Sequence, residues 1–141
     1  MSDRVSPRVR RVLETALDCD DLPRSAAFYK GLLGVTPMLE VERLVAIDAG
    51  EGTVLLMFQK GAASSVRLPG GLVPAHESGG PGHFAFAIDA DDLPAWEARL
   101  TGLGIAIESR VTWERGGVSV YFRDPDNRLV ELATPGLWPS Y

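Results

Sequence analysis

Hydrophobic and polar side chains alternate along residues 11–19, RVLETALDC, and place Leu13, Thr15 and Leu17 on one face of a predicted strand. The spacing becomes helical over residues 20–34, DDLPRSAAFYKGLLG, which begin with an aspartate cap and a proline and end at a glycine. A strand followed at once by a helix is therefore predicted. Three further strands are predicted after the helix, at residues 36–41, 43–49 and 53–60.

The same pattern begins again in the second half of the chain. DDLP occurs at 20–23 and at 91–94, and the second copy opens a predicted helix over 91–104, which follows a strand over 83–89. The predicted buried side of this helix consists of Leu93, Trp96, Leu100 and Leu103. Three strands are predicted after it, at residues 105–109, 118–124 and 129–135.

An internal β-α-β-β-β duplication predicts an α+β fold of two tandem βαβββ modules with eight strands. Each sheet is expected to pack its helix on one face and to leave the other face free, so that the curved eight-stranded sheet forms a cleft. We predict one domain over residues 1–141, with module 1 at about 10–61 and module 2 at about 83–136. The segment between them, about 62–82, is rich in glycine, serine and proline and is predicted to be a loop or linker.

Charge and cysteine content narrow the choice of partners. Fourteen basic and nineteen acidic residues give a net charge of −5, which argues against nucleic acid or an anionic membrane as the main partner. The basic start, residues 1–11, is followed by no long apolar run, so it resembles neither a signal peptide nor a spanning helix and predicts a soluble tail. Cys19 is the only cysteine, which excludes an intrachain disulfide and favours the cytoplasm.

Candidate chemistry centres on Glu131, the carboxylate in the otherwise apolar strand sequence LVELA, because a buried carboxylate needs a cation, a metal or water nearby. When the two copies are aligned, Glu14 and His83 fall on the same face of the first strands. Matching the glycines that close the two modules places Leu56 opposite Glu131. Imidazole and carboxylates at equivalent inward positions predict a site for a divalent ion such as Fe, Mn, Ni, Co or Zn, with coordination positions open to water and substrate.

Each candidate residue also has an ordinary structural interpretation. Glu131 could instead meet an arginine or water, and His83 could be a surface residue that forms hydrogen bonds. His76, in the linker, is either a substrate contact or a solvated loop residue. Trp113 and Tyr121 either line the cleft beside the metal, where they would suit an apolar or planar substrate, or pack as ordinary sheet residues.

Three motifs carry a family resemblance: the strand ending in DDL before SAAFYKGLLG, GHFAF at the start of the second module, and FRDPDNRLVEL at its end. With them the chain resembles the vicinal oxygen chelate (VOC) superfamily, the group of glyoxalase I, bleomycin-resistance proteins and extradiol dioxygenases. The resemblance covers nearly the whole chain and implies the glyoxalase fold. It also implies a homodimer, whose site lies within one chain or is shared between two.

In the VOC superfamily the metal ligands come from the first and last strands of each module, which implies Glu14, His83 and Glu131 as ligands here. Glu14 stands where a histidine is common. Leu56 stands where glyoxalase I would place a second glutamate, so that it supplies apolar wall near the metal. The resulting three-ligand set is closer to the dioxygenase and epimerase patterns.

The hypothesis from sequence is therefore a small metal-dependent enzyme, of isomerase, lyase or dioxygenase type, that acts on a small substrate with vicinal oxygens. A carboxylate that can leave the metal, Glu14 or Glu131, would move the proton. The competing hypothesis is a metal-free protein that sequesters a small toxic compound, as the bleomycin-resistance relatives do.

Overall fold

The computed structural model of the chain describes residues 7, 11–62, 65–76 and 80–141. Most of the basic start, which the sequence predicts to be a soluble tail, lies outside these residues, as do short stretches of the predicted linker. Among the described residues, no helix has the length and apolar character needed to cross a membrane.

The first module contains one helix and one four-stranded sheet. Its elements are β1 (Glu14–Cys19), α1 (Leu22–Leu33), β2 (Leu39–Val41), β3 (Leu44–Asp48) and β4 (Val54–Gln59), and the sheet order is β1-β4-β3-β2. The helix starts where Asp21 accepts a hydrogen bond from the Arg24 amide, and it ends at Gly34 in the left-handed conformation. These are the start and stop signals predicted from the sequence.

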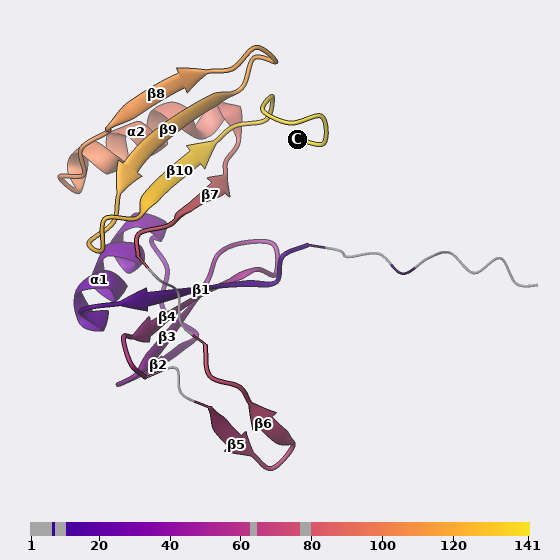
Figure 1. The fold of residues 1–141 in the computed structure, drawn as a ribbon. Coiled ribbons are helices and arrows are strands. Elements are labelled where there is room, and N and C mark those ends of the chain that lie inside the picture. Colours follow the sequence, from indigo (N-terminus) through magenta and orange to yellow (C-terminus); the bar gives the residue numbers. More distant parts are fainter. Residues whose placement is uncertain (1–6, 8–10, 63–64, 77–79) are drawn as a thin grey trace, which may run out of the picture.

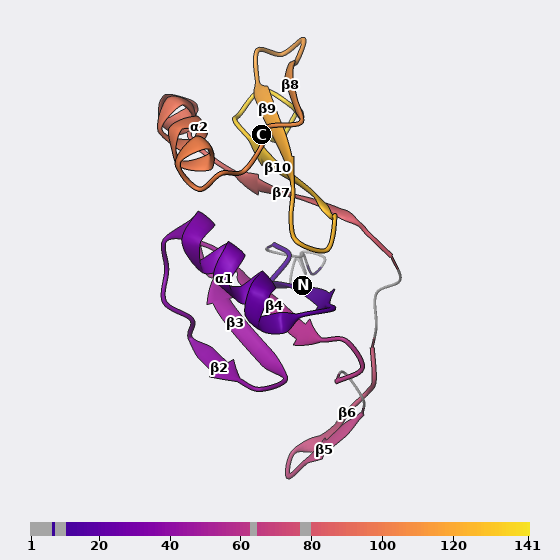
Figure 2. The same cartoon turned by 90° about the vertical axis from the view of Figure 1, so that its left-hand side faces the viewer.

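The second module repeats this topology. Its elements are β7 (His83–Ala87), the 3₁₀ turn η1 (Ala90–Asp92), α2 (Leu93–Gly102), β8 (Ser109–Thr112), β9 (Val118–Arg123) and β10 (Leu129–Ala133), in the sheet order β7-β10-β9-β8. The α+β fold with two equivalent sheets is thus confirmed. Figure 1 shows the two sheets one above the other, with α1 between them, and Figure 2 shows the same arrangement from the side.

Two local predictions in the second half are wrong. The strand predicted at 105–109 begins at Ser109, because the Ile105 amide still donates to the Leu100 carbonyl and closes the end of α2. Leu103, predicted on the buried side of α2, is 46% exposed because the helix ends at Gly102.

The linker between the modules is not a simple loop. It contains a hairpin of β5 (Val66–Leu68) and β6 (Gly71–Val73), which raises the number of strands in the described residues from the predicted eight to ten. Pro69 and Gly70 stand between the two strands, and this pair is typical of a tight turn. In Figure 1 the hairpin projects away from both sheets.

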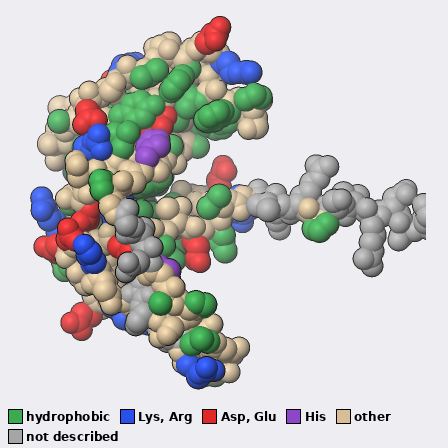
Figure 3. Space-filling view, in the orientation of Figure 1, with side chains coloured by type: hydrophobic (Ala, Val, Ile, Leu, Met, Phe, Trp, Pro, Cys, Tyr) green, Lys and Arg blue, Asp and Glu red, His purple; other side chains and the backbone are tan. Residues whose placement is uncertain are grey.

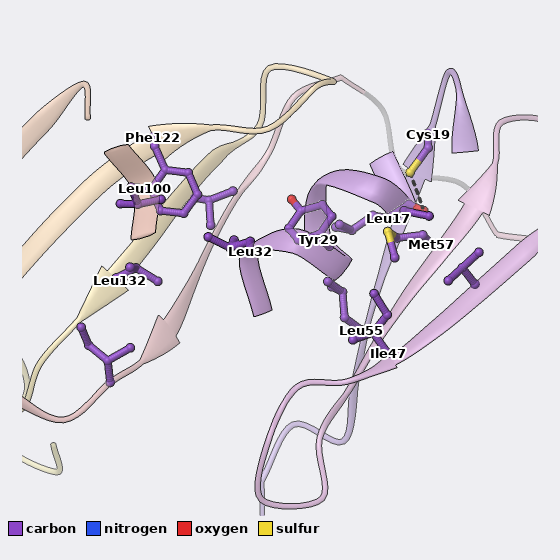
Figure 4. Close-up of a cluster of buried hydrophobic side chains, with 14 of the residues drawn as sticks. Leu17, Cys19, Tyr29, Leu32, Ile47, Leu55, Met57, Leu100, Phe122 and Leu132 are labelled. Atoms are coloured by element: carbon purple, nitrogen blue, oxygen red, sulfur yellow. Dashed lines mark hydrogen bonds between the residues drawn. The ribbon is translucent and has the colours of Figure 1, made fainter. Parts of the chain in front are cut away.

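One hydrophobic core connects the two modules through α1. Tyr29 and Leu32 of this helix are fully buried, and both belong to a cluster that includes Met57 of the first sheet and Phe122 of the second. In Figure 4 the side chains of Tyr29 and Leu32 lie between the side chains contributed by the two sheets. Because each sheet packs a helix on one face, its opposite face stays open.

A charged turn between β9 and β10 fixes the second module against the first. We call Asp124, Asp126 and Arg128 the turn clamp. Arg128 pairs with Asp124 over 2.9 Å, and both side chains are almost completely buried. The Arg128 guanidinium also donates to the Asp18 carbonyl at the end of β1.

Helix α1 supplies further partners of the turn clamp. Ser25 donates to Asp126 over 3.0 Å, and the Tyr29 hydroxyl donates to Asp124 over 2.6 Å. Burial raises the pKa of Tyr29 above its ordinary value, and the Asp124 carboxylate adds to the rise, so this hydroxyl keeps its proton. The turn clamp is therefore a buried polar network that joins β1 and α1 to the start of β10.

We expect Arg128→Met to lower the free energy of unfolding by about 3–5 kcal/mol, because it leaves Asp124 buried without its cation. Urea unfolding measures the change. The matched control is Arg123→Met, which removes an exposed arginine paired with Glu108 on the surface and should change stability little. Equal losses in the two variants would show that the turn clamp contributes no more than a surface ion pair.

Candidate metal centre

The strand register relates the candidate residues of one module to those of the other. The corresponding parallel pairs are Glu14 with Val54 and His83 with Leu129. Two residues beyond these partners, the last strands carry Leu56 and Glu131. Because side chains two residues apart on a strand share a face, the register matches the equivalence of Glu14 with His83 and of Leu56 with Glu131.

His83 and Glu131 meet on the open face of the second sheet. The His83 Nε2 atom lies 3.2 Å from Glu131 Oε1, and His83 Nδ1 lies 2.9 Å from the Leu129 carbonyl oxygen. A carbonyl oxygen can only accept, so Nδ1 carries a hydrogen and donates it. In the neutral ring the lone pair of Nε2 then faces Glu131, and two electron-pair donors this close need a proton or a metal cation between them.

The distance between these two donor atoms fits a shared metal ion. Metal bonds of about 2.1 Å place two ligand atoms about 3.0 Å apart at a right angle and about 3.4 Å apart at the tetrahedral angle. The observed 3.2 Å between Nε2 and Oε1 lies between these values. A neutral imidazole whose other nitrogen donates to a carbonyl is also the usual state of a metal-bound histidine.

Glu131 is held from behind by the sheet. Only 5% of the residue is exposed, and its Oε2 atom accepts a hydrogen bond from the buried Ser119 hydroxyl on β9. Ser119 in turn accepts from Trp113 Nε1 over 2.8 Å. The described side chains that contact this carboxylate include a histidine and a serine, and no ion pair joins it to an arginine among the described residues.

The pair lies in a cleft of about 430 Å³ on the open face of the second sheet. Its lining contains both aromatic residues predicted from sequence, Trp113 and Tyr121. Aromatic and apolar side chains of the C-terminal segment close one side, and they are Leu137, Trp138 and Tyr141. Figure 3 shows hydrophobic side chains gathered on this face beside a histidine. The cleft therefore combines a polar floor with apolar walls, as small-molecule sites do.

Sequence reasoning missed several residues of this site. Ser119 could have been found, because it lies on the same strand face as Tyr121 and that face adjoins Glu131. Trp138 and Tyr141 gave no signal, because no periodic pattern covers the last residues. The Tyr141 hydroxyl lies 2.8 Å from the Ala133 carbonyl oxygen and 3.2 Å from that of Ile88, and these contacts fold the segment back over the cleft.

The other predicted site residues lie on the first module and in the linker. Glu14 is exposed at the start of β1, and Leu56 is half-buried in β4. The His76 ring packs edge-on against Phe58 at 4.6 Å between centroids. These three side chains are not in the lining of the cleft, and the described residues contain no group of three or more His, Cys, Asp or Glu placed to hold one ion. A single chain thus brings together two of the three predicted ligands.

Tyr121 faces Glu131 across the strand pair, and its ring lies 6.2 Å from that of His83. Desolvation raises the pKa of the Tyr121 hydroxyl, and the Glu131 carboxylate adds to the rise because it disfavours a second negative charge. The phenol therefore stays protonated at neutral pH and can donate a hydrogen bond into the cleft.

Comparison with known proteins identifies the family. The family model described as Glyoxalase/Bleomycin resistance protein/Dioxygenase superfamily matches residues 11–132. The chain belongs to this superfamily. Its glyoxalase fold is also that of a lactoylglutathione lyase from Agrobacterium tumefaciens, whose crystal structure aligns over 94% of this chain and 99% of its own, with a TM-score of 0.83 and 32% sequence identity.

Two curated proteins are also similar in sequence. The glutathione transferase FosA of Serratia marcescens is 29% identical over 116 residues, which are 82% of this chain and 74% of the transferase. The metallothiol transferase FosB of Bacillus licheniformis is 43% identical over 53 residues, which are 37% of this chain and 34% of that protein. The second match thus spans only about a third of its relative.

In the metal-free protein we expect Glu131→Gln to lower the pKa of Tyr121, because it removes the neighbouring negative charge. The pKa should stay above its ordinary value, since burial is unchanged. A pH titration of the tyrosine ring carbons by NMR measures the shift, and Tyr121→Phe identifies the resonance. An unchanged Tyr121 titration in Glu131→Gln would contradict this electrostatic coupling.

Proposed function

We propose that this protein is a metal-dependent enzyme of the superfamily that acts on a small substrate with two adjacent oxygen atoms. The observation that carries the proposal is the His83–Glu131 pair, 3.2 Å apart on the floor of an aromatic cleft. The donor set of one imidazole and one carboxylate suits a divalent ion such as Fe, Mn, Ni, Co or Zn.

The third ligand in this proposal is Glu14 of a second copy. Glu14 does not line the cleft of its own chain, although it occupies the position equivalent to His83. β1 and β7, which carry the two residues, each form an edge of their sheet, so a second chain can approach both. We propose a homodimer in which the first sheet of one chain covers the cleft of the other.

Exposed apolar side chains on the first module support this arrangement. Val12 and Leu13 next to β1 are 72% and 58% exposed, and Leu39 and Val41 on β2 are 45% and 46% exposed. Leu56 of β4 and the linker residue His76, whose ring packs on Phe58 of the same strand, would face the partner's cleft. The apolar wall and substrate contact proposed for these two residues therefore depend on the dimer.

The residues of the cleft can perform three tasks in such a reaction. A bound ion would supply Lewis-acid polarisation of the substrate oxygens. Glu131 and Glu14 are the carboxylates that could accept or return a proton at the substrate. Tyr121 keeps its proton and can donate a hydrogen bond to a developing oxyanion, while Trp113 and Trp138 keep water away and contact an apolar or planar group.

The relatives support a narrower proposal for the reaction. The names of the lyase and of both transferases refer to glutathione or to a thiol. We therefore favour lyase or transferase chemistry on a small thiol-derived compound over ring cleavage. The cleft of about 430 Å³ has room for a substrate of modest size.

A metal-free binding protein is the second candidate. The aromatic walls favour it, because Trp113, Tyr121 and the 67% exposed Trp138 would hold a planar compound without any ion. In that case the Nε2 atom of His83 would also carry a hydrogen and donate it directly to Glu131. Metal content separates the two candidates.

We expect the protein purified without chelators to contain one divalent ion per chain by elemental analysis, and Glu131→Gln to abolish stoichiometric binding. The variant keeps the size of the side chain and removes the ligand charge. Glu108→Gln is the matched control, because Glu108 is an exposed glutamate of the same module that pairs with Arg123. If the parent protein contains no ion, even after incubation with Mn²⁺, Ni²⁺ or Zn²⁺, the metalloenzyme proposal is wrong and the metal-free binding protein is the remaining candidate.

A shared site can be tested by mixing two inactive variants. Glu14→Ala and His83→Ala should each lose metal alone. After joint refolding, the mixed dimer holds one complete site, formed by Glu14 of one chain and His83 with Glu131 of the other. We expect about one ion per mixed dimer, isolated with two different affinity tags. No recovery in a verified mixed dimer would show that Glu14 does not complete the site across chains.

A further inference from the structure

A hydrogen-bonded chain lies behind Glu131 and reaches the surface of the cleft. Trp113 follows β8 and is 38% exposed at the cleft, whereas Ser119 on β9 is fully buried. The Trp113 indole Nε1 donates to Ser119 Oγ over 2.8 Å, and the Ser119 hydroxyl donates to Glu131 Oε2. Three side chains, one from the loop after β8 and two from strands β9 and β10, are thus connected in a fixed order.

The chemistry of the three groups determines which atom donates in each hydrogen bond. The indole nitrogen is a donor only, and the serine hydroxyl has a single proton. Ser119 therefore accepts from Trp113 and must give its own proton to Glu131. The Oε2 atom of Glu131 accepts this hydrogen bond, while the Oε1 atom lies 3.2 Å from His83 Nε2.

We propose that Ser119 and Trp113 are positioning residues that hold Glu131 so that it offers one oxygen, Oε1, to the metal beside His83. This inference rests on the proposed function, because it assigns a role toward the proposed ion. With Oε2 held by Ser119, Glu131 would bind an ion through Oε1, which would leave more coordination positions for a chelating substrate.

The same contacts give Trp113 a second role as a rigid wall. Its indole is fixed by the bond to Ser119, so its exposed ring presents a preorganised flat surface to the substrate. Trp113 and Glu131 are the two ends of one series of hydrogen bonds. A planar substrate group would contact the Trp113 end, and a bound ion would contact the Glu131 end. The inference therefore favours substrates that carry a planar or apolar group next to their paired oxygens.

Metal titration tests the positioning role. By calorimetry with Mn²⁺ alone, we expect Ser119→Ala to bind about ten- to a hundred-fold more weakly than the parent. Ser119→Thr keeps the hydroxyl and should restore most of the affinity. Trp113→Phe removes only the indole N–H and should cause a smaller loss.

Matched controls are available on the same module. Ser109→Ala changes an exposed serine of β8, and Trp96→Phe changes a tryptophan of α2 on the opposite face of the sheet. Neither should alter the affinity for Mn²⁺. Thermal melting shows which variants are folded at the titration temperature, so that a loss of affinity is measured only on folded protein.

A readout without metal separates this inference from the proposed function. In the metal-free parent, we expect the Trp113 indole proton to exchange slowly with solvent by NMR, and Ser119→Ala to accelerate the exchange. If folded Ser119→Ala binds Mn²⁺ as tightly as the parent does, the positioning role is wrong and the proposed function is unaffected. Absence of metal binding in the parent would overturn both, even with a protected indole.

Discussion

The arrangement of the two modules depends on one buried ion pair, that of Arg128 with Asp124. Two charges taken out of water need good geometry and further hydrogen bonds, and here the Asp18 carbonyl and the Tyr29 hydroxyl supply them. The residue after Arg128 is Leu129, the first of β10, whose carbonyl oxygen accepts from His83. The same turn that joins the modules therefore also sets the position from which β10 presents Glu131.

From this turn outward, the site follows from the duplicated sheet. Each helix covers one face, so the candidate ligands stand on the opposite face at equivalent register positions. The two copies differ at the last of these positions, where the second module carries Glu131 and the first carries Leu56. As a result, the second module presents an imidazole and a carboxylate together, whereas the first contributes a single carboxylate and apolar surface. A site shared between copies of the chain would combine these two unlike halves.

Much of the fold could be predicted from the sequence, because the DDLP motif and the strand alternation occur twice. Asp21, Gly34 and the DDLP repeats mark α1 and α2 by local chemistry, and local chemistry is what a sequence displays most directly. The approach of His83 to Glu131 could also be predicted, because aligning the two copies of the repeat places both residues at equivalent inward positions. Other features depend on tertiary contacts that leave no periodic signal. The chain gives no pattern for the C-terminal wall at Trp138, nor for the separation of Glu14 from the cleft of its own chain.

The hairpin of β5 and β6 has a consequence for how stability is distributed in the molecule. Its strands bond mainly to each other, and Leu68 and Leu72 are 52% and 51% exposed. A two-stranded hairpin with so little buried apolar surface is marginally stable in water, so opening it costs far less than unfolding either sheet. The hairpin can therefore open and close as an independent local unit while the turn clamp, the core around α1 and the floor of the cleft keep their native packing.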